Sequence, residues 1–239
     1  MQHIGTHLRR SGFAIVAAPK VAQLCEAALD PFVALQNFRY PLSHGAPAPS
    51  VDLHYRNAFN SVYQFAASSL HAACGADFPL PPSSSAPYSM DGLQTEPFAH
   101  MTNGNLPFSA SFFSLFNYNH GFLNIHVDRG LVTAVYAKRS GGFVGDQVRL
   151  WCRPHCTNRW LDVDAAVDDL DCDGAVVFFV GEQLEAASGG AFRAITHGCL
   201  LDPTAERIDT RLNRHPGARE SGNRASAALV LCKAEEDTF

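Results

Sequence analysis

The chain is poor in charge and has no long hydrophobic run. Charged residues make up 17% of its 239 residues and hydrophobic residues 46%, a balance that excludes a disordered chain or a coiled coil. No apolar run approaches the roughly 18 residues of a membrane span, and the opening stretch MQHIGTHLRRSGFAIVAAPK lacks the apolar region of a secretory signal. The net charge of -5 lacks the basic excess of a general nucleic-acid binder. We therefore expect a globular, soluble, cytoplasmic protein that binds neither nucleic acid nor membrane.

Signature motifs of several enzyme classes are also missing. The sequence contains neither a G-x-x-x-x-G-K-[ST] phosphate loop nor a G-x-S-x-G nucleophile elbow, which argues against a kinase-like enzyme or an α/β-hydrolase. Seven scattered cysteines, an odd number, indicate reduced thiols rather than a disulfide framework. Cys152, His155 and Cys156 make a weak zinc site because no second Cys/His pair stands at a suitable spacing. The alternative is a β-hairpin whose cysteines pack as small apolar residues.

Apolar spacing divides the chain into a helical first half and a strand-rich second half. Residues 4–38 are predicted as helix, strand, helix, and residues 51–74 as a further helix. From about Ser109, aromatic and β-branched runs separated by Gly, Asn and Asp predict eight strands. They are SFFSLFNYN, FLNIHV, LVTAVYA, QVRLWCR, RWLDVD, GAVVFFVG, FRAITHGCL and RASAALVLCK. Eight short strands favour a closed or sandwiched antiparallel jelly roll. We expect one integrated domain, with residues 1–108 supporting a β core at 109–239.

Three polar residues in the strand-rich half form a candidate metal site. His126 and Asp128 stand two apart in LNIHVDRG, so in a strand both project from one face. His197, in FRAITHGC on a later predicted strand, is the candidate third ligand. Two imidazoles and one carboxylate leave open positions on a metal, as in non-haem Fe(II) oxygenases. The plain alternative is an exposed polar pair on a strand, because the chain has 11 histidines.

Two longer segments connect these residues to a known family. HVDRGLVTAVY and GAVVFFVGEQLEAASGGAFRAITHG resemble the iron-binding core of the isopenicillin N synthase-like branch of the 2-oxoglutarate/Fe(II)-dependent oxygenases. The resemblance implies a mainly β fold with flanking helices and a double-stranded β-helix (jelly-roll, cupin-like) core. It also implies that His126, Asp128 and His197 hold Fe(II), with 2-oxoglutarate and O2 as cosubstrates and ascorbate as a candidate reductant.

The segment NRASAALVL matches the R-x-S motif with which this family holds the remote carboxylate of 2-oxoglutarate. A guanidinium can donate two parallel charge-assisted hydrogen bonds, and a serine two residues along a strand lies on the same face. The resemblance therefore implies that Arg224 and Ser226 bind the cosubstrate, although Arg224 could instead face solvent. Where family members often have N-x-Y followed by Pro, this chain reads NYNH. Asn119 thus stands in place of the usual tyrosine, and Asn117 and Asn119 are candidate cosubstrate contacts.

The activity that the resemblance implies is the oxidation of a small organic metabolite coupled to conversion of 2-oxoglutarate into succinate and CO2. Hydroxylation is the default outcome, and desaturation or ring closure are alternatives. Two other functions stay open: an Fe(II) oxidase of the same fold that does not use 2-oxoglutarate, and a catalytically silent binding module. A nucleic-acid demethylase is disfavoured, because Val230 stands where that branch has a second arginine. The additions at residues 201–222 and around WCRPHCTNRW are candidates for shaping a substrate pocket.

Overall fold

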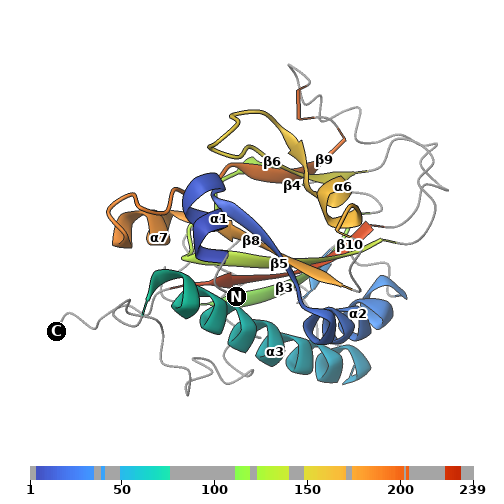
Figure 1. Ribbon diagram of the computed structural model, residues 1–239. Coiled ribbons are helices and arrows are strands. Elements are labelled where there is room, and N and C mark those ends of the chain that lie inside the picture. The colour runs from blue at the N-terminus through green and yellow to red at the C-terminus, as the bar shows by residue number, and fades with distance from the viewer. Residues whose placement is uncertain are drawn as a thin grey trace.

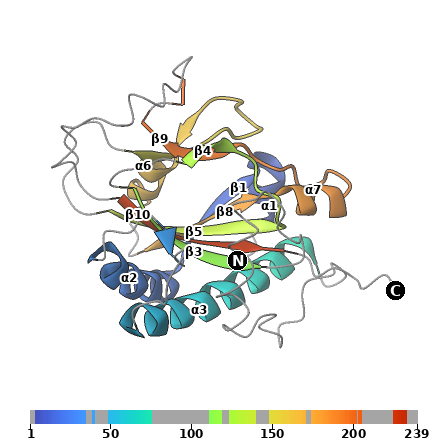
Figure 2. The same ribbon diagram turned by 180° about the vertical axis from the view of Figure 1, so that it is seen from behind.

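The computed structural model describes residues 4–34, 39–40, 49–75, 111–118, 123–139, 148–170, 174–201, 203–204 and 224–232. Most of the segment 201–222 and residues 119–122 lie outside these ranges. Two antiparallel sheets face each other, and a layer of helices covers the outer face of the larger sheet (Figure 1). Figure 2 shows the same layers from behind, with α2 and α3 on one side and the smaller sheet on the other.

The first elements confirm the predicted order of helix, strand, helix. They are α1 (Ile4–Ser11), β1 (Phe13–Ala17) and α2 (Pro19–Ala34), and the longer helix α3 spans Pro49–Cys74. Gly12 ends α1: its N–H donates to the carbonyl of Leu8 at 3.0 Å, and its φ of 81° is the left-handed conformation that glycine adopts at helix ends. The turn allows β1 to leave the helix and join the sheet.

The larger sheet contains six strands in the order β1-β8-β5-β10-β3-β2. Its further members are β2 (Arg39–Tyr40), β3 (Phe112–Asn117), β5 (Val132–Arg139), β8 (Ala175–Val180) and β10 (Arg224–Leu231). Every pairing within it is antiparallel. All six residues of β8, AVVFFV, are buried, because helices cover one face of this strand and the second sheet covers the other. This double burial explains why β8 is an unbroken apolar run rather than an alternating one.

The smaller sheet has the order β4-β9-β6-β7. Its strands are β4 (Leu123–His126), β6 (Arg149–Cys152), β7 (Leu161–Asp162) and β9 (His197–Leu200), and the short helices α6 (Val163–Asp168) and α7 (Glu182–Ala187) follow β7 and β8. Two predicted strands are shorter than expected. In RWLDVD the strand stops at Asp162, whose Oδ1 accepts from the Ala165 N–H at 3.0 Å and so caps α6. In FRAITHGCL the strand begins only at His197.

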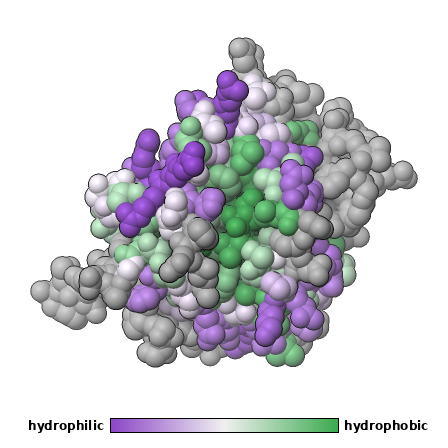
Figure 3. All heavy atoms as spheres, viewed as in Figure 1, coloured by the Kyte–Doolittle hydropathy of each residue, from purple (hydrophilic) through white to green (hydrophobic). Residues whose placement is uncertain are grey.

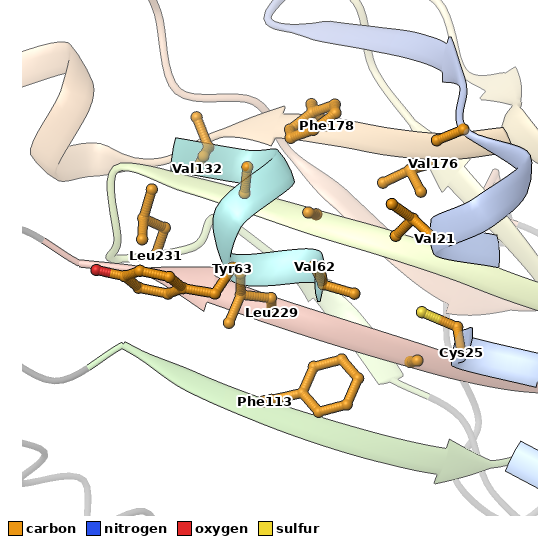
Figure 4. Close-up of a cluster of buried hydrophobic side chains, with 14 of the residues drawn as sticks. Val21, Cys25, Val62, Tyr63, Phe113, Val132, Val176, Phe178, Leu229 and Leu231 are labelled. Carbon is orange, nitrogen blue, oxygen red and sulfur yellow. The ribbon is translucent and has the colours of Figure 1, made fainter. Parts of the chain in front are cut away.

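The buried side chains form two clusters, one on each face of the larger sheet. The first lies between that sheet and the helices, where residues of α2 and α3 face those of β3, β5, β8 and β10 (Figure 4). The second cluster lies between the two sheets and includes Tyr118, Val177, Phe179, Ile195 and Cys199. The candidate metal ligands, Arg224 and Ser226 lie in and around this inner cluster, so the layer formed by α2 and α3 supports the sheet without entering the site.

On the face seen in Figure 3, apolar residues gather near the centre and hydrophilic residues surround them. Strand β1 forms one edge of the larger sheet, and its residues Phe13, Ile15 and Val16 are only partly buried. None of the helices in the described part of the chain combines the length and apolar character needed to cross a membrane.

Candidate iron and cosubstrate site

Strand pairing brings the two histidines together. β4 and β9 are antiparallel neighbours, and His126 lies directly opposite His197 in their register. Side chains at such cross-strand positions are close neighbours on one face of a sheet, and the two imidazole rings have centroids 4.6 Å apart. Asp128 lies two residues after the end of β4, and its carboxylate lies beside both imidazole rings. The structure thus gathers the three residues expected to hold the metal.

The three side chains present their ligand atoms to one small volume. Asp128 Oδ1 lies 3.2 Å from His126 Nε2, and Asp128 Oδ2 lies 3.2 Å from His197 Nε2. The potential ligand atoms of these three side chains all lie within 4.8 Å of one another. The exposed fraction of the side chain falls from 33% at His126 to 13% at Asp128 and 5% at His197. The site is therefore buried on one side and open on the other.

Neighbouring groups set the orientation of each candidate ligand. His126 Nδ1 lies 2.7 Å from the carbonyl oxygen of Asn124, and His197 Nδ1 lies 3.2 Å from that of Ile195. A proton on each Nδ1 donates to these carbonyls, which leaves the Nε2 lone pairs available to a metal. Thr133 Oγ1 donates to Asp128 Oδ2.

An aromatic side chain forms one wall of this site. The ring of Phe179 stacks on His197 at a centroid distance of 4.3 Å and an angle of 8°. Phe179 is fully buried, so it restrains the imidazole and keeps water from that side.

The electrostatics of the site show how strongly the three groups interact. Burial alone would raise the pKa of Asp128, but hydrogen bonds and charge interactions with His197 and His126 outweigh burial and hold that pKa far below its usual range. Burial also acts to lower the pKa of His126, yet its hydrogen bond to Asp128 leaves the pKa raised. Asp128 is therefore an anion at neutral pH, as a metal ligand must be.

The loop after Asp128 is held against the start of α7. The N–H of Glu182 donates to the Asp128 carbonyl at 2.8 Å, and the N–H of Gln183 donates to the Gly130 carbonyl at 3.1 Å. A Cβ atom on Gly181 would lie 2.2 Å from the Gly130 carbonyl oxygen, closer than any side chain permits. Glycine at 181 is thus required for this contact, which fixes the backbone that carries Asp128.

A second polar group lies deeper between the sheets, on β10. Arg224 and Ser226 are 4% and 2% exposed, so Arg224 does not face solvent. Nη1 of Arg224 donates to Asp164 Oδ2, whereas its Nε and Nη2 are buried and have no hydrogen-bond partner among the described residues. Burial alone would lower the pKa of Arg224, but Asp164 raises it overall. The arginine is therefore a buried cation with one edge paired and the other edge available.

Tyr118 and Cys199 are neighbours of this arginine to which no sequence motif pointed. Ser226 Oγ donates to Tyr118 Oη at 3.4 Å, and the guanidinium carbon of Arg224 lies 5.8 Å from the centre of the Tyr118 ring. Burial raises the pKa of Tyr118 well above its usual value, so its hydroxyl keeps its proton. Burial likewise raises the pKa of the Cys199 thiol, and the nearby Arg224 acts against that rise. Tyr118 stands two residues after Phe116, which also faces the inner cluster. Strand alternation could therefore have placed Tyr118 on the inner face from the sequence.

The two asparagines chosen from the sequence are placed differently. Asn117 is 3% exposed and, by strand alternation from Leu115, lies on the face of β3 toward the helices. Asn119 lies outside the described residues. Both asparagines thus remain predictions as cosubstrate contacts, and the side chain that the structure does place against Ser226 is Tyr118.

The weak zinc candidate does not form a ligand cluster in the described part of the chain. Cys152 is buried in the inner core, and Cys156 is exposed with its Sγ 3.5 Å from Ser11 Oγ. His155 Nε2 lies 3.0 Å from the carbonyl oxygen of Ala194. Cys152 therefore packs as a small apolar residue, as the alternative interpretation expects, whereas the exposed Cys156 does not.

Solved structures with the same arrangement of sheets and helices are oxygenases. A protein from Shewanella oneidensis described as an oxygenase superposes with a TM-score of 0.60 and 15% sequence identity, over 98% of this chain and 86% of the other. A 2OG-Fe(II) oxygenase family protein from Caulobacter crescentus gives a TM-score of 0.56 and 14% identity, over 97% and 81% of the two chains. This chain has the 2-oxoglutarate/Fe(II) oxygenase fold.

Further comparisons agree with that oxygenase fold. The Neurospora crassa protein T7H, solved with alpha-KG and 5-formyluracil, superposes with a TM-score of 0.53 and 10% identity, over 97% of this chain and 77% of T7H. In sequence, a 2-oxoglutarate-dependent dioxygenase from rice is 33% identical over 58 residues, which is 24% of this chain and 15% of the rice protein. No family model matches the chain. The resemblance to the 2-oxoglutarate/Fe(II) oxygenases and the jelly-roll fold are confirmed, while the isopenicillin N synthase-like branch stays a prediction.

Proposed function

We propose that the protein is a 2-oxoglutarate-dependent Fe(II) dioxygenase that oxidises a small organic metabolite. In the hydroxylation that we take as its default reaction, one oxygen atom of O2 enters the substrate as a hydroxyl group. The other enters succinate, which forms from 2-oxoglutarate with loss of CO2. The four electrons that reduce O2 thus come from 2-oxoglutarate and the substrate, two from each. The small-molecule substrate class draws support from T7H, whose structure holds 5-formyluracil.

The donor set of the triad fits Fe(II). His126 and His197 offer neutral nitrogens and Asp128 offers an anionic oxygen, the set that non-haem Fe(II) sites use on one face of the metal. The His126 side chain is partly exposed, so a metal held by the three ligands would be accessible from that side. When bound there, Fe(II) supplies the site at which O2 is reduced and the cosubstrate is oxidatively decarboxylated.

The unpaired edge of Arg224 is the observation that carries the proposal. Nε and Nη2 form one side of the guanidinium fork, and two parallel N–H donors on that side match the two oxygens of a carboxylate. Both nitrogens are buried without a partner in the described part of the chain, and such groups are costly unless a ligand satisfies them. Ser226, whose hydroxyl donates to Tyr118 Oη, and Tyr118, whose hydroxyl keeps its proton, lie next to this edge.

The two ends of the site have a spacing that suits the cosubstrate. His197 and Cys199 project from the same face of β9, and Cys199 lies beside Arg224. Residues i and i+2 of a strand are about 7 Å apart, which is of the order of the length of a five-carbon dicarboxylic acid. A 2-oxoglutarate molecule can therefore reach the triad with its keto acid while its far carboxylate reaches Arg224.

The same observation distinguishes this function from the alternatives. A 2-oxoglutarate-independent oxidase would need a carboxylate on its own substrate to satisfy the buried edge of Arg224, whereas the cosubstrate of a dioxygenase always brings one. A silent binding module has no need for three oriented ligand groups with an anionic Asp128. We therefore favour the dioxygenase.

Succinate formation tests the proposal. Protein purified without oxygen would receive Fe(II), ascorbate and 2-oxoglutarate, then O2, with and without a mixture of candidate metabolites. We expect succinate from the wild type, rising with one component of the mixture, and none from His197→Ala. Fe(II) binding without any succinate across the substrate mixtures would favour the 2-oxoglutarate-independent oxidase, and absence of Fe(II) binding would favour the binding module.

A further inference from the structure

We infer that Asp164 is a positioning residue that sets the affinity of the cosubstrate carboxylate by sharing the charge of Arg224. This inference rests on the proposed function and extends it to a residue outside the family motifs. Asp164 is on α6, 60 positions before Arg224 in the sequence, and the two side chains are each 4% exposed. Sequence spacing alone could not have connected them.

Asp164 is oriented from two sides. Its Oδ2 accepts from Nη1 of Arg224 and from the backbone N–H of Leu150, the latter at 2.9 Å. Leu150 belongs to β6 in the smaller sheet and Arg224 to β10 in the larger sheet. The carboxylate therefore joins the two sheets and restrains the guanidinium so that its Nη1 points toward α6. As a consequence, the opposite edge, formed by Nε and Nη2, remains the available one.

Charge sharing follows from this arrangement. A buried cation needs a counter-ion, and without cosubstrate Asp164 supplies it. When a cosubstrate carboxylate occupies the other edge, two anions flank one guanidinium in a water-poor interior, where like charges repel strongly. Asp164 therefore stabilises the protein without ligand and weakens the binding of the ligand's far carboxylate. A purely structural ion pair between α6 and β10 would have the first effect without the second.

Asp164→Asn separates these two roles because the change removes charge with little change in shape. The hydrogen bonds from Leu150 and Arg224 end on the same oxygen, Oδ2, so the single carbonyl oxygen of asparagine can accept both. Asp162→Asn is the matched control. Asp162 lies two residues earlier and pairs with Arg149, with 2.6 Å between its Oδ2 and Arg149 Nε, and asparagine also caps helices well.

The experiment is anaerobic calorimetry of 2-oxoglutarate binding to the Fe(II)-loaded wild type and both variants, together with thermal unfolding with and without 2-oxoglutarate. For Asp164→Asn we expect a lower unfolding temperature without 2-oxoglutarate, binding tighter by about tenfold as the repulsion is removed, and a larger rise in unfolding temperature on adding 2-oxoglutarate. Asp162→Asn should bind 2-oxoglutarate within about twofold of the wild type, since its charge is not on Arg224.

Each remaining outcome supports or overturns the inference. Equal or weaker binding of 2-oxoglutarate by Asp164→Asn, with binding by the wild type intact, overturns it and leaves the proposed function standing. Failure of the wild type itself to bind 2-oxoglutarate overturns the proposed function instead. If Asp164→Asn is unfolded alone but folds when 2-oxoglutarate is present, the ligand has supplied the missing counter-ion and the inference is supported. A variant that stays unfolded at saturating 2-oxoglutarate contradicts it.

Discussion

Removing Arg224 together with its partner gives the sharpest prediction about the cosubstrate end of the site. Arg224→Gln alone would leave Asp164 buried without its counter-ion, at a cost of about 3–5 kcal/mol in stability that would obscure any effect on binding. The double variant Arg224→Gln/Asp164→Asn removes both charges at once. It should therefore fold, and its cosubstrate affinity can be measured.

The size of the effect follows from the two unpaired donors of Arg224. Hydrogen bonds to a charged group contribute about 1.5–3 kcal/mol each, so two contribute about 3 kcal/mol at the lower end of that range. Since 1.4 kcal/mol corresponds to a factor of ten, the KM for 2-oxoglutarate should rise roughly a hundredfold relative to Asp164→Asn, which keeps Arg224. Relative to the wild type the rise should be about tenfold, because loss of the Asp164 charge tightens binding about tenfold. Unfolding of the metal-free double variant should differ from the wild type by far less than that of Arg224→Gln.

The assay is succinate formation at varied 2-oxoglutarate, supported by anaerobic calorimetry. The control is Arg149→Gln/Asp162→Asn, which removes a partly exposed ion pair from the same region. Its KM should stay within about twofold of the wild type, because Arg149 and Asp162 pair with each other and not with Arg224. Its stability should fall by at most about 1 kcal/mol. A folded Arg224→Gln/Asp164→Asn protein with the wild-type KM would refute the assignment of Arg224 to the cosubstrate.

Three further predictions concern the metal site and the core. His126→Ala and Asp128→Ala should each abolish 2-oxoglutarate turnover and weaken Fe(II) binding measured by anaerobic titration, and full turnover in either variant would contradict the triad. The rise in unfolding temperature on adding Fe(II) should be larger at about pH 8 than at about pH 6, because protons compete for His126, whose pKa is raised. Without metal the sign reverses: the contribution of His126 to stability is fully present below about pH 6.5 and is lost as the pH rises through its raised pKa. Phe113→Ala should lower the free energy of unfolding by about 3–5 kcal/mol in urea titrations, because Phe113 is fully buried. Leu53→Ala, at a side chain 59% exposed, should change it by less than about 0.5 kcal/mol.

Local sequence patterns were sufficient for most elements of this fold. Helix α2 follows from apolar residues at helical spacing, and β8 from an unbroken apolar run. Strand alternation was enough to predict that His126 and Asp128 converge, although β4 ends at His126 and Asp128 lies two residues beyond it. The choice of His197 came from resemblance to a family, and the register that places it opposite His126 is a property of the folded sheet.

Packing decided the features that depend on contacts between distant segments. RWLDVD reads as a strand by its composition, but Asp162 caps a helix and the strand is only two residues long. Strand alternation in SFFSLFNYN could not show that Tyr118 lies against Ser226 across a chain separation of 108 residues.

The partnership of Asp164 with Arg224 is the clearest case of a feature that only the tertiary structure reveals. The residues around Asp164 form no motif, and acidic residues at the start of a helix usually face solvent. Burial of both charges between the sheets makes their pairing energetically necessary. Residue type and spacing were thus enough to predict His126 and Asp128 as metal ligands, and family resemblance added His197. The electrostatic environment of Arg224 depends instead on which distant side chains pack beside it and are excluded from water.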